Sequence, residues 1–342
     1  MKRKRRETRR SSQKRKRIRY SRTLYDILKD EYVVKKDGYY LIEVPAESVR
    51  ELIEEYSKSV FFETVSEVVF RERLSFPYRC FVLSKEEVLE KFENLKNFEM
   101  EEEVQEEPYQ VATTHLSEKV GWNTDFDGKY VVFPGSAREY FDMNVLRDYF
   151  RSLERARMRS TIGRQESTYD HWYNKRLHPK WISILKEKVA GKEGYKEMKT
   201  YQLRETMYEL GLEPTGFKAS VALSLYKKFN PRKILDFSSG WGDRLLAALA
   251  YEENLTYFVG VDPNIELVDG YQEMIDCLAN DKDKFQMISA PFETEGIIPE
   301  EKNSFDFIFT SPPYFDYEVY SCGKTGQSTT SYPDFIDWVL NF

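Results

Sequence analysis

The chain has 342 residues, of which 41% are hydrophobic and 15% aromatic, and its formal net charge is −6. This composition excludes a wholly disordered chain or a fibre, and the length predicts two or three domains with hydrophobic cores. No run of about 18 uncharged apolar residues occurs, so the sequence predicts no membrane span.

Cysteine usage and the first residues indicate the compartment. The cysteines Cys80, Cys277 and Cys322 lie far apart and form no CxxC or Cys/His spacing, so we predict neither a disulfide framework nor a metal site. The N-terminus is basic and no apolar segment follows it, so we expect no secretory signal. These features predict an intracellular protein.

The charge is unevenly distributed. Residues 1–22 hold 13 Lys and Arg side chains and one Glu, a net of +12, so the rest of the chain carries −18. Runs of like charge stay disordered, and basic arms bind nucleic acid or act as nuclear localisation signals. We predict a disordered tail with a polyanionic partner in the nucleus, a virus particle or a host cell, with the cytoplasm left open. The alternative is a tail that only keeps the protein soluble.

Residues 23–107 mix strand and helix signals and predict a small α+β domain. β-rich runs on both sides of Lys36-Asp37-Gly38 predict a hairpin. Apolar residues three and four apart predict a helix from Pro45 to Tyr56. We expect further strands at residues 60–71 and 78–83.

An acidic segment ends this region. Residues 86–107 contain ten Glu and two Lys. We interpret them as a surface helix that continues into a solvated linker, with a domain boundary near Glu107-Pro108. The alternative is that the segment shields the basic tail within the molecule.

Residues 108–211 are rich in arginine and aromatic side chains. Guanidinium groups bind phosphates and aromatic rings stack on bases, so this composition fits a groove for nucleic acid. A helix with aromatic side chains in the core and arginines in solvent explains the pattern equally well. The candidate nucleic-acid-binding residues are Arg151, Arg155, Arg157, Arg159 and Arg164.

Residues 212–342 alternate between helix and strand. The expected strands are 233–237, 257–261, 285–289 and 305–310; the expected helices are 215–229, with Phe217, Val221 and Leu225 on its apolar face, 244–251, one that ends at Leu278, and 332–342. This alternation predicts an α/β fold with a parallel sheet and helices on both faces. In such sheets, ligands bind outside the carboxyl ends of the strands.

The turn after the first of these strands has features of a cofactor site. Gly240 and Gly242 let the backbone approach a ligand closely, and the following helix favours an anionic group. Asp262 ends the second strand, where a carboxylate can accept hydrogen bonds from ribose hydroxyls. Leu245 replaces the third small residue of the dinucleotide fingerprint, which argues against NAD or FAD, and the lack of a Walker lysine excludes a P-loop NTPase.

The fourth strand ends in Ser311-Pro312-Pro313-Tyr314. Two consecutive prolines fix φ and remove backbone donors, so the carbonyl groups there point in set directions. A rigid turn explains the prolines alone. It does not explain their place after the fourth strand, between Ser and Tyr.

Both segments resemble motifs of a known family. Residues 236–242, Asp-Phe-Ser-Ser-Gly-Trp-Gly, match the first motif of S-adenosyl-L-methionine-dependent methyltransferases with a Rossmann-like fold. Ser311-Pro312-Pro313-Tyr314 matches the motif of those that methylate exocyclic amino groups of nucleic-acid bases, and the run that continues to Glu318 resembles DNA methylases of phages and large DNA viruses. The likeness covers about residues 165–342, with a motif order similar to the γ arrangement.

The resemblance implies methylation of adenine N6 or cytosine N4, with DNA favoured over RNA. The Ser311 hydroxyl and the Pro312 carbonyl would accept hydrogen bonds from the amine, and Tyr314 would stack on a flipped base. The implied cofactor-binding residues are Asp236, Ser238, Gly240, Gly242, Asp262, Phe292 and Phe217, with Lys218 and Glu293 as further candidates.

One departure from the family leaves alternatives open. The family's sheet has seven strands, and three have no counterpart before Phe342. We expect a truncated product or fragment, or a sheet completed by another chain or by the N-terminal half. One alternative function is a non-catalytic nucleic-acid-binding or virion structural protein on a methyltransferase-like scaffold. Another is a methylase of RNA or of protein glutamine.

Overall fold

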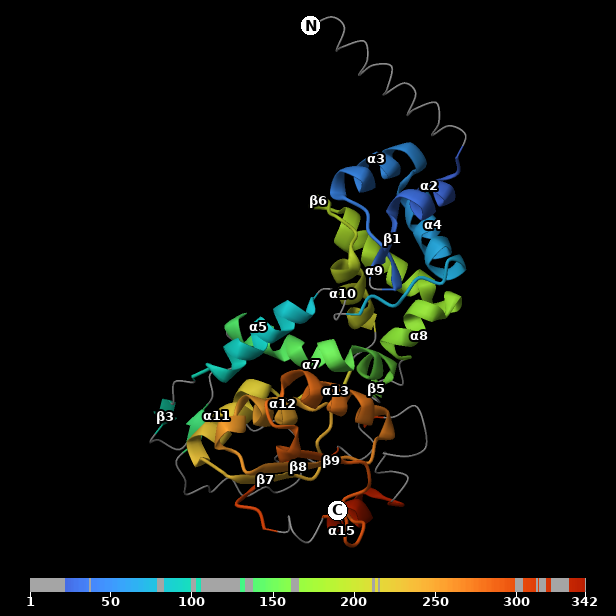
Figure 1. Ribbon diagram of the computed structural model, residues 1–342. Helices are drawn as coiled ribbons and strands as arrows, with labels where there is room; N and C mark the ends of the chain where they lie inside the picture. The colour runs from blue at the N-terminus through green and yellow to red at the C-terminus, as the bar shows by residue number, and fades with distance from the viewer. Residues whose placement is uncertain are drawn as a thin grey trace, which may run out of the picture.

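The computed structural model (Figure 1) describes most of the chain. The described residues are 22–36, 38–78, 83–99, 103–105, 130–132, 138–160, 166–210, 213–214, 216–298, 304–311, 313, 318–320 and 332–341. The predictions for residues 1–21, for most of the strand at 78–83 and for the boundary at 107–108 lie outside these ranges.

The N-terminal unit is built from two distant parts of the chain. Its elements are α2 (Leu24–Tyr32), β1 (Val33–Lys36), β2 (Tyr39–Ile42), α3 (Ala46–Tyr56), α4 (Lys58–Arg71), α8 (Thr168–Tyr173), α9 (His178–Ala190), β6 (Gly194–Tyr195) and α10 (Thr200–Leu210). The hairpin is confirmed: β1 and β2 pair antiparallel, and Gly38 has a φ of +87°, as a tight hairpin turn requires. Helix α3 is confirmed as well.

Residues 58–71 form a helix where the sequence predicted a strand. Ser57 caps α4 by accepting a hydrogen bond from the Val60 amide. The side chains of Phe61, Val65 and Val68 are fully buried, at helical spacing. β-branched residues favour strands when they are considered alone. Here packing against α2 and α9 overrides that preference, because a helix buries this face against both neighbours.

Two helices connect this unit to the rest of the molecule. They are α5 (Lys85–Lys96) and α7 (Arg138–Arg157). Helix α5 is confirmed as a helix, but it is not only a surface element: Val88, Phe92 and Leu95 are buried against α7 and the helices of the sheet. The acidic composition obscured this apolar stripe.

A four-stranded parallel sheet forms the core of the C-terminal unit, as predicted. Its order is β10 (Phe307–Ile308), β7 (Lys233–Asp236), β8 (Tyr257–Val261) and β9 (Phe285–Ile288). Helices α11 (Ala219–Phe229), α12 (Asp243–Ala250) and α13 (Val268–Leu278) cover the face toward α7 (Figure 1). The fold is therefore α/β.

The opposite face of the sheet differs from the prediction. In the described residues it is covered by the segment that follows β9, whose Phe292, Ile297 and Ile298 pack against the cluster of Leu235, Tyr257, Val259 and Val261. This segment is not helical as far as Ile298. The prediction of helices on both faces is thus confirmed for one face of the sheet, and the described segment on the other face is not helical.

Helix α11 also presents another face than the predicted one. Ala222, Leu223 and Tyr226 are buried, whereas Val221 and Leu225 are only partly covered. The reason is that the helix begins at Ala219 and packs on α12 through its small residues, which leaves Phe217 in the preceding loop.

Short elements complete the described fold. They are the antiparallel pairs β3 (Glu103–Gln105) with β4 (Tyr130–Val132) and β5 (Arg159–Ser160) with β11 (Glu318–Val319), the 3-10 turns Lys175–Leu177, Glu252–Asn254, Ile265–Leu267 and Lys282–Lys284, and α15 (Phe335–Asn341). Among all the residues that the structure describes, no helix combines the length and apolar character needed to cross a bilayer.

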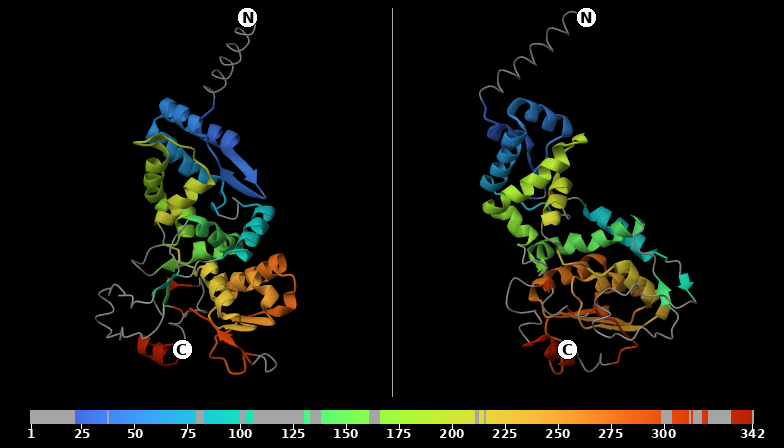
Figure 2. Two further views of the ribbon diagram at one scale, coloured as in Figure 1. Left: turned by 90° about the vertical axis from the view of Figure 1, so that its left-hand side faces the viewer. Right: turned by 180° about the vertical axis from the view of Figure 1, so that it is seen from behind.

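The hydrophobic cores divide the chain differently from its order in sequence. One core joins residues 24–78 to helices α8, α9 and α10, and the other joins α5 and α7 to the sheet and its helices. Helix α7 lies between the two units (Figures 1 and 2). The predicted division at 23–107, 108–211 and 212–342 therefore cuts across both cores.

Candidate functional site

The strand order reverses at β7, and we call the place outside the carboxyl ends of β7 and β10 the crevice, after the position where such sheets bind ligands. The chain runs from β7 to β8 and β9 in one direction and then returns to place β10 on the other side of β7. Ligands of open parallel sheets bind outside the carboxyl ends at such a reversal. Residues 237–242, which follow β7, and residues 309–311, which follow β10, lie at this point.

The two sequence motifs contact each other there. The Ser238 hydroxyl donates a hydrogen bond of 2.8 Å to the carbonyl oxygen of Ser311 and is also hydrogen-bonded to the Thr310 hydroxyl. Because the single hydrogen of Ser238 is used toward Ser311, Thr310 is the donor of the second bond. The glycine turn and the start of the Ser-Pro-Pro-Tyr segment are thus held together.

The two glycines of the turn differ in how closely other atoms of the chain approach them. Both have positive φ, +56° at Gly240 and +84° at Gly242, a conformation that L side chains rarely adopt. A Cβ on Gly242 would lie 3.0 Å from the Met274 sulfur, so this position is closely packed. A Cβ on Gly240 would meet no atom nearer than 3.8 Å. The backbone of Gly240 is therefore the part of the turn that a ligand can approach.

Asp262 holds the turn from the end of β8. Its two oxygens accept hydrogen bonds from the amides of Gly240 (2.8 Å) and Asn264 (2.9 Å). Burial raises the pKa of this carboxyl to about 6, although the two amide bonds oppose the shift. Each oxygen keeps a second lone pair, so the carboxylate can still accept a hydrogen bond from a ligand hydroxyl.

Asp236 is the last residue of β7 and directly precedes the turn. It is fully buried and accepts a hydrogen bond of 2.8 Å from Arg244 Nε. Burial raises its pKa, and Arg244 opposes the shift. Arg244 also donates to the Ser238 carbonyl. Through Arg244, Asp236 therefore helps to orient the turn.

Arg244 was not among the predicted site residues. The signal that could have identified it is a charged residue at the start of the helix Asp243–Ala250, which is otherwise apolar after its first two positions. A buried charge in such a place needs a buried partner, and the nearest acidic residue in an adjoining strand is Asp236.

Two predicted aromatic residues flank the crevice on opposite sides of the sheet. Phe217 packs edge-on against Phe309, with ring centroids 5.4 Å apart. Phe292 stacks on Phe237 at 4.7 Å. The further candidates Lys218 and Glu293 are exposed, and Pro313 is half-buried. Pro312 and Tyr314 lie outside the described residues.

Two of the predicted nucleic-acid-binding arginines lie in the interior. Arg151 is 1% exposed, donates to the Leu267 carbonyl and lies over the ring of Tyr271. Arg155 is 5% exposed, donates to the Pro214 carbonyl at 3.0 Å and pairs with Asp148. These guanidinium groups hold α7 against the sheet unit. Neither residue is therefore placed to contact a phosphate of a nucleic acid, contrary to the prediction.

The other candidate arginines have different surroundings. Arg157 is exposed and lies 5.2 Å from the centroid of the Tyr169 ring. Arg159 is exposed and pairs with Asp170 at 2.9 Å. Arg164 lies outside the described residues. Among those described, Arg157 and Arg159 alone of the candidates can reach a nucleic acid.

An unpredicted ion pair links α7 to the glycine turn. Arg147 donates to both oxygens of Asp243, at 2.8 and 3.0 Å, and both side chains are buried. Asp243 directly follows Gly242 and begins α12. Its partner lies 96 residues earlier in the chain, so no local pattern pointed to the pair.

Comparisons with known proteins give the site no counterpart: no family model, no curated protein and no solved structure matches the chain. In the described part of the chain, no three His, Cys, Asp or Glu side chains gather so that they could hold a metal ion.

Proposed function

We propose that the protein is an S-adenosyl-L-methionine-dependent methyltransferase that acts on the exocyclic amino group of a nucleic-acid base, with DNA as the favoured polymer. The observation that carries the proposal is the hydrogen bond from Ser238 to the Ser311 carbonyl. It joins the two motifs of the resemblance at the strand reversal, where a Rossmann-like sheet binds its ligand.

The residues around the crevice fit this cofactor. Gly240 has an open side next to its backbone, as the methionine part of the cofactor needs. Asp262 keeps lone pairs for ribose hydroxyls. Phe292, stacked on Phe237, offers an apolar surface for the adenine. When bound, the cofactor supplies a methyl group on a sulfonium sulfur.

The chain's own part in the reaction is to prepare the amine. An exocyclic amine is a weak nucleophile because its lone pair is delocalised into the ring. The Ser311 hydroxyl would accept one amine hydrogen and so orient the lone pair, and the bond from Ser238 fixes the backbone of Ser311 for that task. In the proposed site Tyr314 stacks on the base.

Cofactor binding is the first test. We expect calorimetry to detect binding of S-adenosyl-L-methionine by the full chain, and binding weaker by about 10- to 100-fold in Asp262→Ala, because a charged hydrogen-bond acceptor is removed. Glu253→Ala is the matched control, since Glu253 is exposed and precedes β8 at the other end of the strand. A folded chain that binds no cofactor would contradict the proposal.

Methyl transfer is the second test. With labelled cofactor, we expect incorporation into DNA, and we expect Ser311→Ala to lower turnover by at least about tenfold while cofactor affinity is kept. Nucleoside digestion separates N6-methyladenine from N4-methylcytosine. Incorporation only into RNA or into protein glutamine would instead support the corresponding alternative acceptor.

A second candidate is a nucleic-acid-binding or virion structural protein that keeps the scaffold without catalysis. The observation that favours it is that both oxygens of Asp262 and the Nε group of Arg244 are already engaged within the chain. Nucleic-acid binding by a chain with no measurable cofactor affinity would decide for this candidate.

A further inference from the structure

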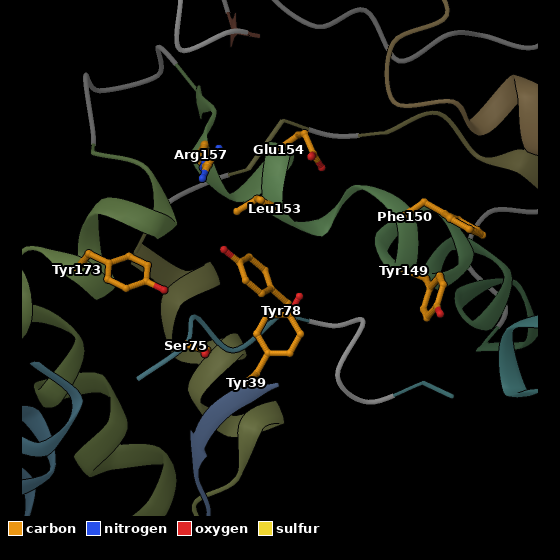
Figure 3. A pocket seen from close by; sticks show the side chains of 9 residues that line it. All are labelled: Tyr39, Ser75, Tyr78, Tyr149, Phe150, Leu153, Glu154, Arg157 and Tyr173. Atoms are coloured by element: carbon orange, nitrogen blue, oxygen red, sulfur yellow. The ribbon is translucent and has the colours of Figure 1, made fainter. Parts of the chain in front are cut away.

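A cavity lies away from the crevice, between the N-terminal unit and α7 (Figure 3). It has a volume of about 280 Å³. Its walls are mainly aromatic, with Tyr39, Tyr78, Tyr149 and Tyr173, and its two charged side chains are Arg157 and Glu154. A cavity slightly below the usual range of about 300–1,000 Å³ suits one small planar group.

The tyrosines come from separate elements and converge. In Figure 3 the rings of Tyr39 and Tyr78 lie next to each other, and the ring of Tyr173 is directed toward them from α8. Tyr39 is 43% and Tyr173 39% exposed, so solvent reaches both. The Phe76 amide donates a hydrogen bond of 3.0 Å to the Tyr173 hydroxyl, which fixes that ring.

The aromatic surface continues beyond the cavity toward a cation. The ring of Tyr169 lies 4.4 Å from that of Tyr173, and the guanidinium of Arg157 lies 5.2 Å from the ring of Tyr169. Arg157 is exposed, unlike Arg151 and Arg155. Flat rings beside an exposed guanidinium offer both a stacking surface and a phosphate contact.

Helix α7 separates this cavity from the crevice. Arg147, Arg151 and Arg155 are buried among residues of the sheet unit. Tyr149, Leu153 and Arg157, also four residues apart, line the cavity. Because residues four apart share a helix face, the two sets lie on different faces of α7.

We infer that this cavity binds a base of a single-stranded nucleic acid. Every base has a flat face that can stack on tyrosine, whereas bases within a duplex are already stacked on their neighbours. Arg157 contacts the phosphate beside the bound base. The 13 Lys and Arg of residues 1–22 favour the same polyanionic partner. The inference concerns a second site, so it holds or fails independently of cofactor binding at the crevice.

The test uses the full chain and short oligonucleotides that carry the fluorescent base 2-aminopurine. We expect quenching on binding to a single strand and weaker binding to the same sequence as a duplex. Tyr39→Ala should lower single-strand affinity by about 5- to 100-fold, while Tyr39→Phe, which keeps the ring, should bind as the unaltered chain does. Comparing the affinities for a DNA strand and an RNA strand of the same sequence shows which of the two polymers the cavity prefers.

Matched variants make the outcome decisive. Arg157→Gln should reduce the dependence of log affinity on log salt by about 0.7, the value for one phosphate contact on a single strand. Tyr201→Ala on α10 and Arg50→Gln on α3, both exposed, are the controls. The inference is overturned if no single strand binds, if the duplex binds equally well, or if Tyr39→Ala and Arg157→Gln behave as the controls do. Thermal melting verifies that each variant is folded.

Discussion

Asp262 has two tasks that make opposite demands on its charge. Its carboxylate is the acceptor that holds the Gly240 amide and, in the proposed function, the ribose. Its burial disfavours the same charge and raises the pKa to about 6. The glycine turn is therefore held by a group that titrates near neutral pH.

The pH dependence of stability follows from this shift. Between pH 3.8, the ordinary pKa, and about 6 the folded chain keeps a proton that the unfolded chain has released. The contribution of Asp262 to the free energy of unfolding therefore falls as the pH rises through this window, by at most about 3 kcal/mol. We expect urea titrations to show this against Asp262→Asn, whose side chain cannot titrate. The free energy of unfolding of the unaltered chain, minus that of the variant, should fall from pH 4 to 6 and be constant above pH 7. A difference independent of pH would contradict this.

The buried ion pair of Arg147 and Asp243 contributes to the stability of the sheet unit. We expect Arg147→Met to lower the free energy of unfolding by about 3–5 kcal/mol, because it leaves the Asp243 carboxylate buried without its cation. Adding Asp243→Asn should restore part of this stability, since the uncompensated charge is removed. Denaturant titrations of the two single variants and the double variant measure the coupling. Strictly additive effects would show that the pair does not act as a unit.

Among the elements, α4 shows how packing selects secondary structure. Phe61 and Phe62 are adjacent in sequence and both fully buried. Adjacent residues of a strand point to opposite faces, so a strand would need a core on both sides to cover them. On α4 both side chains reach the same core, beside Val65 and Val69.

Alanine substitutions test this helix. We expect Phe61→Ala and Phe62→Ala each to lower the free energy of unfolding by about 3–5 kcal/mol, as is usual for buried phenylalanine. Val60→Ala should change it by less than about 0.5 kcal/mol, because Val60 is 44% exposed. Urea unfolding at one pH compares the three. Large decreases for Val60→Ala and Phe62→Ala together with a small one for Phe61→Ala would match the alternation of a strand instead.

In the whole molecule, basic and acidic residues are concentrated in different parts of the chain, whereas one helix contributes side chains to both hydrophobic cores. Residues 1–22 carry +12 and the remainder −18. Helix α7 contributes side chains to both cores: Leu146 and Phe150 to one, Ala156 to the other. The position of the cavity of Figure 3 depends on this shared helix.

Removal of residues 1–22 tests the role of the basic segment. If the segment binds phosphates, the shortened chain should bind duplex DNA more weakly, and the slope of log affinity against log salt should fall by about 0.9 for each phosphate that the segment neutralises. Fluorescence anisotropy at several salt concentrations measures the slope. An unchanged slope would show that the segment neutralises no phosphate.

Much of the fold could be predicted because its signals are local. The hairpin at Gly38, the helix that ends at Tyr56 and the strand–helix alternation after residue 232 follow from turn residues and hydrophobic spacing. The nature of α4 and the burial of α5 could not be predicted in this way, since both depend on which neighbour covers them.

Periodicity and chain order are enough to predict the parallel sheet, the glycine turn, and the place of Asp262 and Ser311 at strand ends. The bond from Ser238 to Ser311, the internal positions of Arg151 and Arg155, and the cavity formed by separate tyrosines became known from the folded chain alone. The physical reason is that burial and partners arise between residues distant in the chain. A guanidinium in solvent and one paired inside the protein have the same local sequence pattern.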